Sequence, residues 1–202
     1  MNDIPDPTAL RAHMGPVSPT AERKVMHQLD PHARHFIALS PFLVLATSDT
    51  NGQQDASPRG DPAGFVQILD DTTLFLPDRP GNNRVDSFAN ILSNPGIGLL
   101  FFVPGVDETL RVNGTARLST DIDLLAATEV QGRIPRTGMV VSITELFFHC
   151  GKALKRSHLW NPATQIERTT FPTLGRILAD QQNGDATAMN ERIETAYRTR
   201  VY

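Results

Sequence analysis

The fold of this chain is decided by residues 55–102, which read DASPRGDPAGFVQILDDTTLFLPDRPGNNRVDSFANILSNPGIGLLFF. Three short runs rich in β-branched and aromatic residues, each bounded by turn residues, predict strands at Phe65–Leu69, Thr72–Leu76 and Ile97–Phe102. A helix is expected at Val85–Leu92, between the second and third of these strands.

The turn before this helix, PDRPGNNR at residues 77–84, has the composition of an anion site. Two prolines and a glycine favour a tight turn, and Asn82 and Asn83 are predicted to cap the helix. Cationic side chains beside the free N–H groups of a helix N-terminus attract anions. We therefore expect this turn to hold a phosphate group.

Strands are also predicted on both sides of this stretch. Asp49-Thr50-Asn51-Gly52 is a strong hairpin turn, and Gly114 within a later strand marks a bulge or a close approach of backbone or ligand. The additional predicted strands are Phe42–Ser48, Gln53–Pro58, Glu108–Leu118 and Met139–Cys150. Six or seven strands with hairpin turns and peripheral helices predict a mainly β fold, a small antiparallel barrel rather than a βαβ arrangement.

The whole chain, residues 1–202, is expected to form one domain. Residues 1–17 are polar and proline-spaced, and they predict an extended arm. Ser18-Pro19 and Asp30-Pro31 each place a capping residue before a proline, so two helices are expected within residues 18–40. The barrel would occupy residues 42–150, and residues 151–202 predict a C-terminal helical segment.

Composition excludes several classes of protein. Hydrophobic residues make up 40% of the 202 residues, which suffices for a core. The formal charge of −3 argues against a nucleic-acid partner. The apolar runs are too short to span a bilayer, and the single cysteine, Cys150, suits a reducing compartment. A cytoplasmic protein without membrane contact is expected, and no combination of residues predicts a metal site.

Each group of candidate binding residues could either bind a ligand or form ion pairs at the protein surface. Arg59 follows a strand and precedes Gly60, so it could bind a phosphate or a ring carbonyl, or else form a surface ion pair with Asp61. Asp78, Arg79 and Arg84 could likewise be an exposed salt-bridge cluster. Two cation-bearing turns at the ends of neighbouring strands together favour a ligand site more strongly than either turn does alone.

A second cationic group follows the last strand. Lys152 and Arg156 are four residues apart, so they share a face if this segment is helical. They could meet a phosphate or an acidic substrate, or lie in solvent. Trp160 could line a ring edge or simply pack.

The pattern of a strand, a polar basic turn, a short helix, Asn-Pro and an apolar strand resembles the pyridoxamine 5′-phosphate oxidase-like, FMN-binding split β-barrel proteins. The resemblance is greater still to a subgroup of uncharacterised probable FMN-dependent proteins. It is carried by SPRGDPAGFV (57–66), PDRPGNNR (77–84), ETLRVNG (108–114) and FFHCGKALKRSHLW (147–160). The Arg-x-His element with which the true oxidases bind substrate phosphate is missing, so pyridoxamine phosphate is not the expected substrate.

The resemblance implies an FMN-binding flavoprotein that oxidises or reduces a small molecule, with NAD(P)H as a candidate electron donor. It also implies a homodimer with flavin at the subunit interface, where the late segment of one chain contributes to the flavin bound by the other. Arg84 and Asn83 would hold the phosphate, Arg59 or Arg79 would supply a second cation, and Arg59 or a nearby N–H would face the flavin ring. The implied cofactor-binding residues are Ser57, Arg59, Gly60, Asp61, Asp78, Arg79, Asn82, Asn83, Arg84, Lys152, Arg156 and Trp160.

Catalytic residues are not assigned, because the sequence supplies no unmistakable general acid or base. The alternative function is therefore a flavin- or haem-binding module without turnover, which would act as a store, a sensor or a partner protein.

Overall fold

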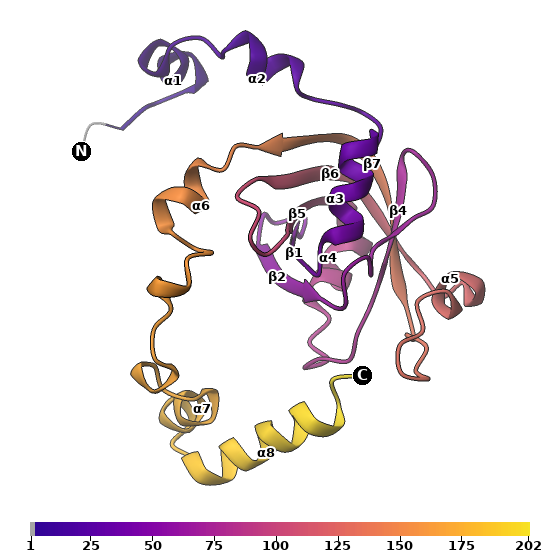
Figure 1. The fold of residues 1–202 in the computed structure, drawn as a ribbon, viewed down its shortest axis with the longest axis vertical. Helices are drawn as coiled ribbons and strands as arrows, with labels where there is room; N and C mark the ends of the chain where they lie inside the picture. The colour runs from indigo at the N-terminus through magenta and orange to yellow at the C-terminus, as the bar shows by residue number, and fades with distance from the viewer. Residues whose placement is uncertain (1–2) are drawn as a thin grey trace.

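The structure is a computed structural model, and it describes residues 3–202 (Figure 1). Seven antiparallel strands form one sheet in the order β2-β1-β5-β6-β7-β4-β3, which confirms the mainly β fold with peripheral helices. The strands are β1 (Phe42–Ser48), β2 (Gln54–Gly60), β3 (Gln67–Ile68), β4 (Thr73–Pro77), β5 (Gly96–Phe102), β6 (Thr109–Ser119) and β7 (Gly138–His149).

The helices are short and lie around this sheet (Figure 1). They are α1 (Pro7–Met14), α2 (Pro19–Arg23), α3 (Pro31–Leu39), α4 (Asp86–Ser93), α5 (Ile122–Ala126), α6 (Lys152–Ser157), α7 (Leu174–Gln182) and α8 (Ala186–Thr199), with 3-10 turns at Pro162–Thr164 and Arg168–Thr170. None of the helices in the described part of the chain is both long enough and apolar enough to cross a bilayer.

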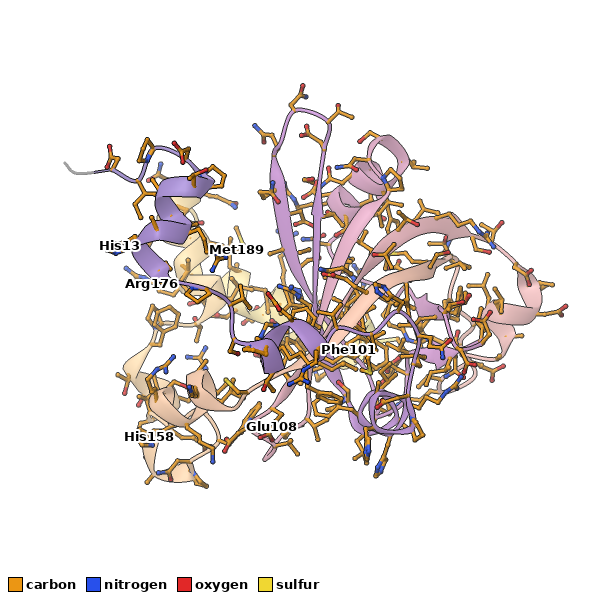
Figure 2. The ribbon with its side chains drawn as sticks, turned by 90° about the horizontal axis from the view of Figure 1, so that it is seen from above. His13, Phe101, Glu108, His158, Arg176 and Met189 are labelled. Atoms are coloured by element: carbon orange, nitrogen blue, oxygen red, sulfur yellow. The ribbon has the colours of Figure 1, made fainter. Side chains whose placement is uncertain are left out.

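The core fills the concave side of the sheet. Alternate residues of the central strands face inward and are fully buried, among them Leu43, Leu45, Leu99, Phe101 and Val112. Phe101 lies in the middle of the barrel in the view from above (Figure 2). Apolar residues of α3 and α4 join the same cluster, so the start of α4 has a fixed place beside the sheet.

A β-bulge divides β7, as the glycine in the middle of β6 predicted. Asn113 pairs with Glu145 and Gly114 pairs with Ile143, so Thr144 has no partner in the register. Val141 before the bulge and Leu146 after it are both fully buried, although they are an odd number of residues apart. The extra residue therefore keeps both halves of β7 facing the core.

Two local predictions were wrong. An extended arm was expected over residues 1–17, of which residues 1 and 2 lie outside the described structure, but residues 7–14 form helix α1. The Asp6 side chain accepts hydrogen bonds from two N–H groups of α1, and Pro7 occupies its first turn. The strand expected at 65–69 pairs only at Gln67–Ile68, next to the β4 turn.

The chain after β7 forms an arm of helices that stands away from the barrel in both views (Figures 1 and 2). Arg176 of α7 and Met189 of α8 lie on this arm. The two helices pack on each other. Gly175 lies at their contact, where a side chain would clash with Asn190. Figure 1 shows that the end of α8 returns to the barrel near the turn that precedes α4.

Candidate functional site

A cavity of about 820 Å³ lies where β2, the turn after β4 and the start of α4 come together. Five arginines and three aspartates are among its described lining residues, so the cavity is polar and carries a cationic surplus. The lining residues are Asp55, Ser57, Pro58, Arg59, Asp78, Arg79, Pro80, Gly81, Asn82, Asn83, Arg84, Val85, Asp86, Ser87, Phe88, Arg133, Ile134, Pro135, Arg136 and Tyr202.

The start of α4 faces this cavity without a side-chain cap. The expected asparagine cap is wrong, because Val85 occupies the N-cap position and no side chain in residues 3–202 bonds the first-turn N–H groups there. Asn82 instead accepts a hydrogen bond from the main-chain N–H of Arg84 at 3.0 Å. Asn83 and Val85 both have positive φ, 59° and 56°, which is rare for a β-branched residue such as valine. The strained turn leaves an uncapped helix N-terminus against the cavity.

Ser87, in the first turn of α4, joins this helix to strand β2. Its hydroxyl donates to Asp55 Oδ2 at 2.5 Å and lies 3.0 Å from Ser57 Oγ. Arg59 Nη2 donates to Ser87 Oγ at 3.0 Å. Because side chains alternate along a strand, Asp55, Ser57 and Arg59 all point to the side of β2 that carries α4.

One buried N–H group of the Arg59 side chain lacks a hydrogen-bond acceptor among the described residues. Its Nη1 donates to the Pro58 carbonyl oxygen at 3.0 Å, whereas its buried Nε has no hydrogen-bond partner among the described residues. Buried donors normally have an acceptor. The guanidinium beside the start of α4 is therefore suited to an anionic or carbonyl ligand.

Asp78 lies in the same cavity. Burial raises the pKa of its carboxyl group, and the positive charges of Arg59 and Arg79 together with the Arg79 N–H oppose this rise. The carboxyl group therefore retains its proton to higher pH than an ordinary aspartate. Because the folded-state pKa is raised, ionisation of Asp78 costs stability, and this cost develops as the pH rises above the ordinary value.

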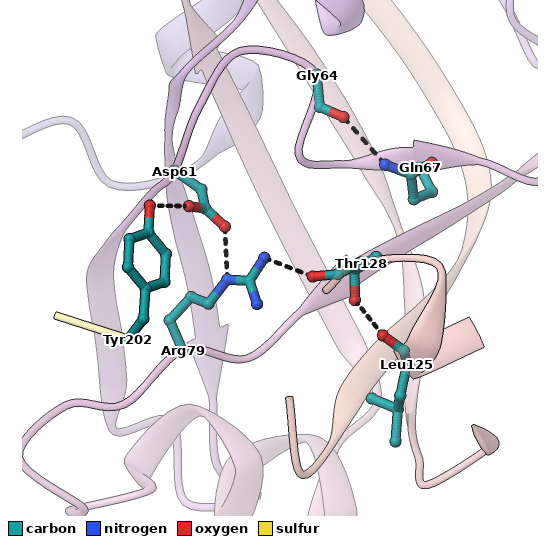
Figure 3. A network of polar contacts seen from close by, with 7 residues as sticks. All are labelled: Asp61, Gly64, Gln67, Arg79, Leu125, Thr128 and Tyr202. Atoms are coloured by element: carbon teal, nitrogen blue, oxygen red, sulfur yellow. Dashed lines mark hydrogen bonds and ion pairs between the residues drawn. The ribbon is translucent and has the colours of Figure 1, made fainter. Parts of the chain in front are cut away.

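Asp61 anchors a second network at the cavity wall (Figure 3). Its side chain is 1% exposed and accepts from Arg79 Nε at 2.5 Å and from the Tyr202 hydroxyl at 2.7 Å. Arg79 also donates to the Thr128 carbonyl oxygen at 2.8 Å. The surface ion pair considered for Arg59 and Asp61 is absent in the described structure, because Arg79 reaches this carboxylate instead.

Arg84 forms an exposed ion pair at the rim of the cavity. Its Nε lies 2.7 Å from Asp86 Oδ2, and the two side chains are 72% and 47% exposed. An exposed pair of this kind contributes little to stability. Arg84 therefore remains available to a ligand, whereas Arg79 is already occupied by Asp61 and Thr128.

The structure brings together the predicted binding residues of β2 and of the turn after β4. The predicted residues that follow β7 lie outside this cavity. Gly60 and Asp61 directly follow the lining residues of β2, and the predicted residues of the turn all line the cavity. Lys152 and Arg156 lie on α6, which belongs to the chain after β7 and stands apart from that turn (Figure 1). Trp160 Nε1 donates to the Val106 carbonyl oxygen at 2.9 Å, so it anchors the chain after α6 to the barrel.

Sequence reasoning missed Ser87, Arg133, Arg136 and Tyr202. Ser87 directly follows the basic turn, and its place in the first helical turn was a usable signal. Arg133, Arg136 and Tyr202 come from segments 49 or more residues beyond the turn, and no local pattern indicates that they meet it.

The curled antiparallel sheet, with a cationic cavity at the start of the helix between β4 and β5, defines a split β-barrel protein. The family model described as pyridoxamine 5′-phosphate oxidase matches residues 29–150. The chain therefore belongs to the pyridoxamine 5′-phosphate oxidase family.

Solved structures with a similar fold include HupZ of Group A Streptococcus, with a TM-score of 0.48 and 21% identity over 59% of this chain and 93% of that chain. A protein related to general stress protein 26, from Clostridium acetobutylicum, has a TM-score of 0.45 and 14% identity over 58% and 85%. An FMN-binding protein from Syntrophomonas wolfei has a TM-score of 0.43 and 16% identity over 58% and 84%. No curated protein matches the chain at a significant level.

Proposed function

We propose that this protein binds FMN in the cavity beside α4 and is an oxidoreductase that acts on a small molecule. The observation that carries the proposal is the uncapped start of α4, which faces a cavity lined by five of the described arginines. Helix N–H groups and guanidinium groups are the donors that bind phosphate in proteins. Membership of the pyridoxamine 5′-phosphate oxidase family supports FMN as the phosphate-bearing compound.

The residues present fit this cofactor. Arg84 and the N–H groups at the start of α4 would hold the phosphate, together with Arg59, whose buried Nε lacks an acceptor. Phe88, Ile134 and Pro135 supply apolar surface for a planar ring system. The flavin, when bound, supplies the redox chemistry, and the protein supplies binding, orientation and electrostatics.

An absorption spectrum of the purified protein with added FMN tests cofactor binding, and a turnover assay tests the activity. We expect flavin bands, and we expect the bound flavin to be reduced by NADH or NADPH and reoxidised by air at catalytic rates. Flavin that is bound but not turned over by either donor would favour a store or a sensor. A haem spectrum would contradict the assignment of the cofactor.

The substitution Arg84→Ala should weaken FMN binding by about 1.5–3 kcal/mol, because it removes a charge-assisted contact to the phosphate. This corresponds to a complex roughly tenfold to hundredfold weaker, measured by fluorescence titration of the flavin. Arg176→Ala is a matched control, since Arg176 is an exposed arginine paired with Asp180 on the distant arm. Riboflavin should bind far more weakly than FMN, and equal affinity for the two compounds would refute phosphate recognition.

We further propose that the protein is a homodimer in which α6 of one chain completes the site of the other. Lys152 and Arg156 have no part in the cavity of their own chain, although the family resemblance assigns this segment to a flavin site. The convex side of β1, β2 and β5 supports a pairing of two barrels, because its side chains are small or apolar and partly exposed. These residues are Phe42, Val44, Ala46, Ala56, Pro58, Gly60, Gly98, Leu100 and Phe102.

Co-expression of two defective variants tests this arrangement. Arg84→Ala damages the cavity, and Lys152→Ala/Arg156→Ala removes the cationic face of α6. If the site is shared, one of the two sites in a mixed dimer is wholly wild type, so the isolated mixed dimers should bind FMN at about half of their sites. A monomer that binds FMN fully, or mixed dimers without any recovery, would show that the site belongs to one chain.

A further inference from the structure

Tyr202 reaches the candidate cavity from the far end of the chain and is fixed there by three contacts (Figure 3). Its hydroxyl donates to Asp61 Oδ1 at 2.7 Å, and its ring lies 5.7 Å from the Arg79 guanidinium carbon. Arg133 Nη1 donates to the main-chain oxygen of Tyr202 at 2.5 Å. Asp61 and Arg133 belong to different segments, so side chain and backbone of Tyr202 are held independently.

The Asp61 carboxylate is the central acceptor of this arrangement. It is almost fully buried and accepts from both Arg79 Nε and the Tyr202 hydroxyl, so these two side chains are positioned by one group. Hydrogen bonds to an ionised acceptor are stronger than those between neutral groups. The hydrogen bond to Asp61 also raises the pKa of Tyr202, so the phenol keeps its proton throughout the neutral range.

The helix that leads to Tyr202 has little hold on the barrel. None of the residues of α8 is buried, and the helix packs on α7 within the arm. The contacts at Tyr202 therefore fasten the end of the arm to the cavity wall. We refer to residues 200–202 with these contacts as the latch.

We propose that Tyr202 is a ligand-contacting residue of the cavity and that the latch slows release of the bound ligand. This inference rests on the proposed function, since the ligand is taken to be a planar heterocycle that carries a phosphate. Tyr202 is a lining residue, and with Ile134 and Pro135 it provides apolar surface for the ring. The two hydrogen bonds of the latch hold this part of the cavity wall in place, so a ligand packed against Tyr202 should leave more slowly while they are formed.

The dissociation rate of FMN tests the ligand contact. We expect Tyr202→Ala to release FMN about tenfold faster than wild type, because both the ring and the hydrogen bond to Asp61 are lost. Tyr202→Phe should lie between these rates, since the ring remains, and Arg133→Ala should also accelerate release. Tyr197→Ala is the matched control, because Tyr197 is a 57% exposed tyrosine of α8 outside the cavity lining.

Limited trypsin digestion tests the latch without any flavin. Arg198 and Arg200 lie four and two residues before Tyr202, so intact-mass analysis should show cleavage there severalfold faster in Tyr202→Ala than in wild type or in Tyr197→Ala. Equal cleavage would overturn the latch, and equal FMN release by wild type and Tyr202→Ala would overturn the ligand contact. Wild-type protein that binds no FMN would instead refute the proposed function, and the ligand contact with it, while digestion still decides the latch.

Discussion

The substitution Arg79→Ala should lower the free energy of unfolding by about 3–5 kcal/mol, because it leaves a buried carboxylate without its counter-charge. The Asp61 and Arg79 side chains are 1% and 15% exposed, so water cannot replace the lost guanidinium. Tyr202 would remain as a donor, but a neutral hydroxyl compensates a buried charge only in part. Urea denaturation of the ligand-free protein measures this effect.

A matched control and a double variant separate charge burial from loss of packing. Arg84→Ala removes an arginine from an exposed ion pair in the same turn, and it should change stability by less than about 1 kcal/mol. Asp61→Ala/Arg79→Ala removes both charges, so it should be more stable than Arg79→Ala alone. If both arginine variants lose the same small amount, the Asp61–Arg79 pair is not a structural element of the cavity wall.

The architecture could be predicted because its signals are local. Short β-rich runs separated by turn residues indicated the strands. In the predicted hairpin turn, the Asp49 carboxylate accepts hydrogen bonds from the main-chain N–H groups of Asn51 and Gln53. The same holds for the helices that follow Ser18-Pro19 and Asp30-Pro31, since each cap acts within three residues. Elements set by neighbouring residues can be read from one sequence.

The pairing of side chains in the cavity could not be predicted in the same way. Arg59 is two residues from Asp61 and Arg79 is eighteen, yet the fold gives the carboxylate to Arg79. Residues two apart along a strand share a face, but their side chains need not touch. The turn after β4, in contrast, places Arg79 next to Asp61. Tyr202 is 141 residues from Asp61, a separation at which no sequence pattern indicates contact.

The expected cap of α4 failed for a related reason. Asparagine is a good N-cap residue, but α4 begins at Asp86, one residue later than expected. Its N-cap residue is therefore Val85, which has a left-handed backbone conformation. Backbone strain of this kind lies outside what residue preferences predict, and it is frequently found at functional sites. Here it leaves the N–H groups of α4 free for the ligand that the cavity is proposed to hold.

The substitution Gly114→Ala should destabilise the fold by about 3 kcal/mol, at the upper end of the cost of overpacking. A Cβ atom on Gly114 would lie 3.0 Å from the Ser142 carbonyl carbon, closer still to its oxygen, and 3.3 Å from Ile143 Cα. These are main-chain atoms of the bulged strand β7, so they cannot move away as a flexible side chain could. Relief would require the bulge at Thr144 to shift, which would turn part of β7 away from the core.

Gly96→Ala is the control, because Gly96 lies in β5, which pairs with β6 one position from Gly114. The nearest atom to a Cβ there is the Asn94 side-chain oxygen at 3.4 Å, an ordinary contact, so stability should change by less than about 0.5 kcal/mol. Both variants remove a glycine from a strand and gain one methyl group. A difference of more than about 2 kcal/mol between their unfolding free energies would therefore isolate the close approach of β6 and β7, whereas equal values would show that the bulge accommodates a side chain.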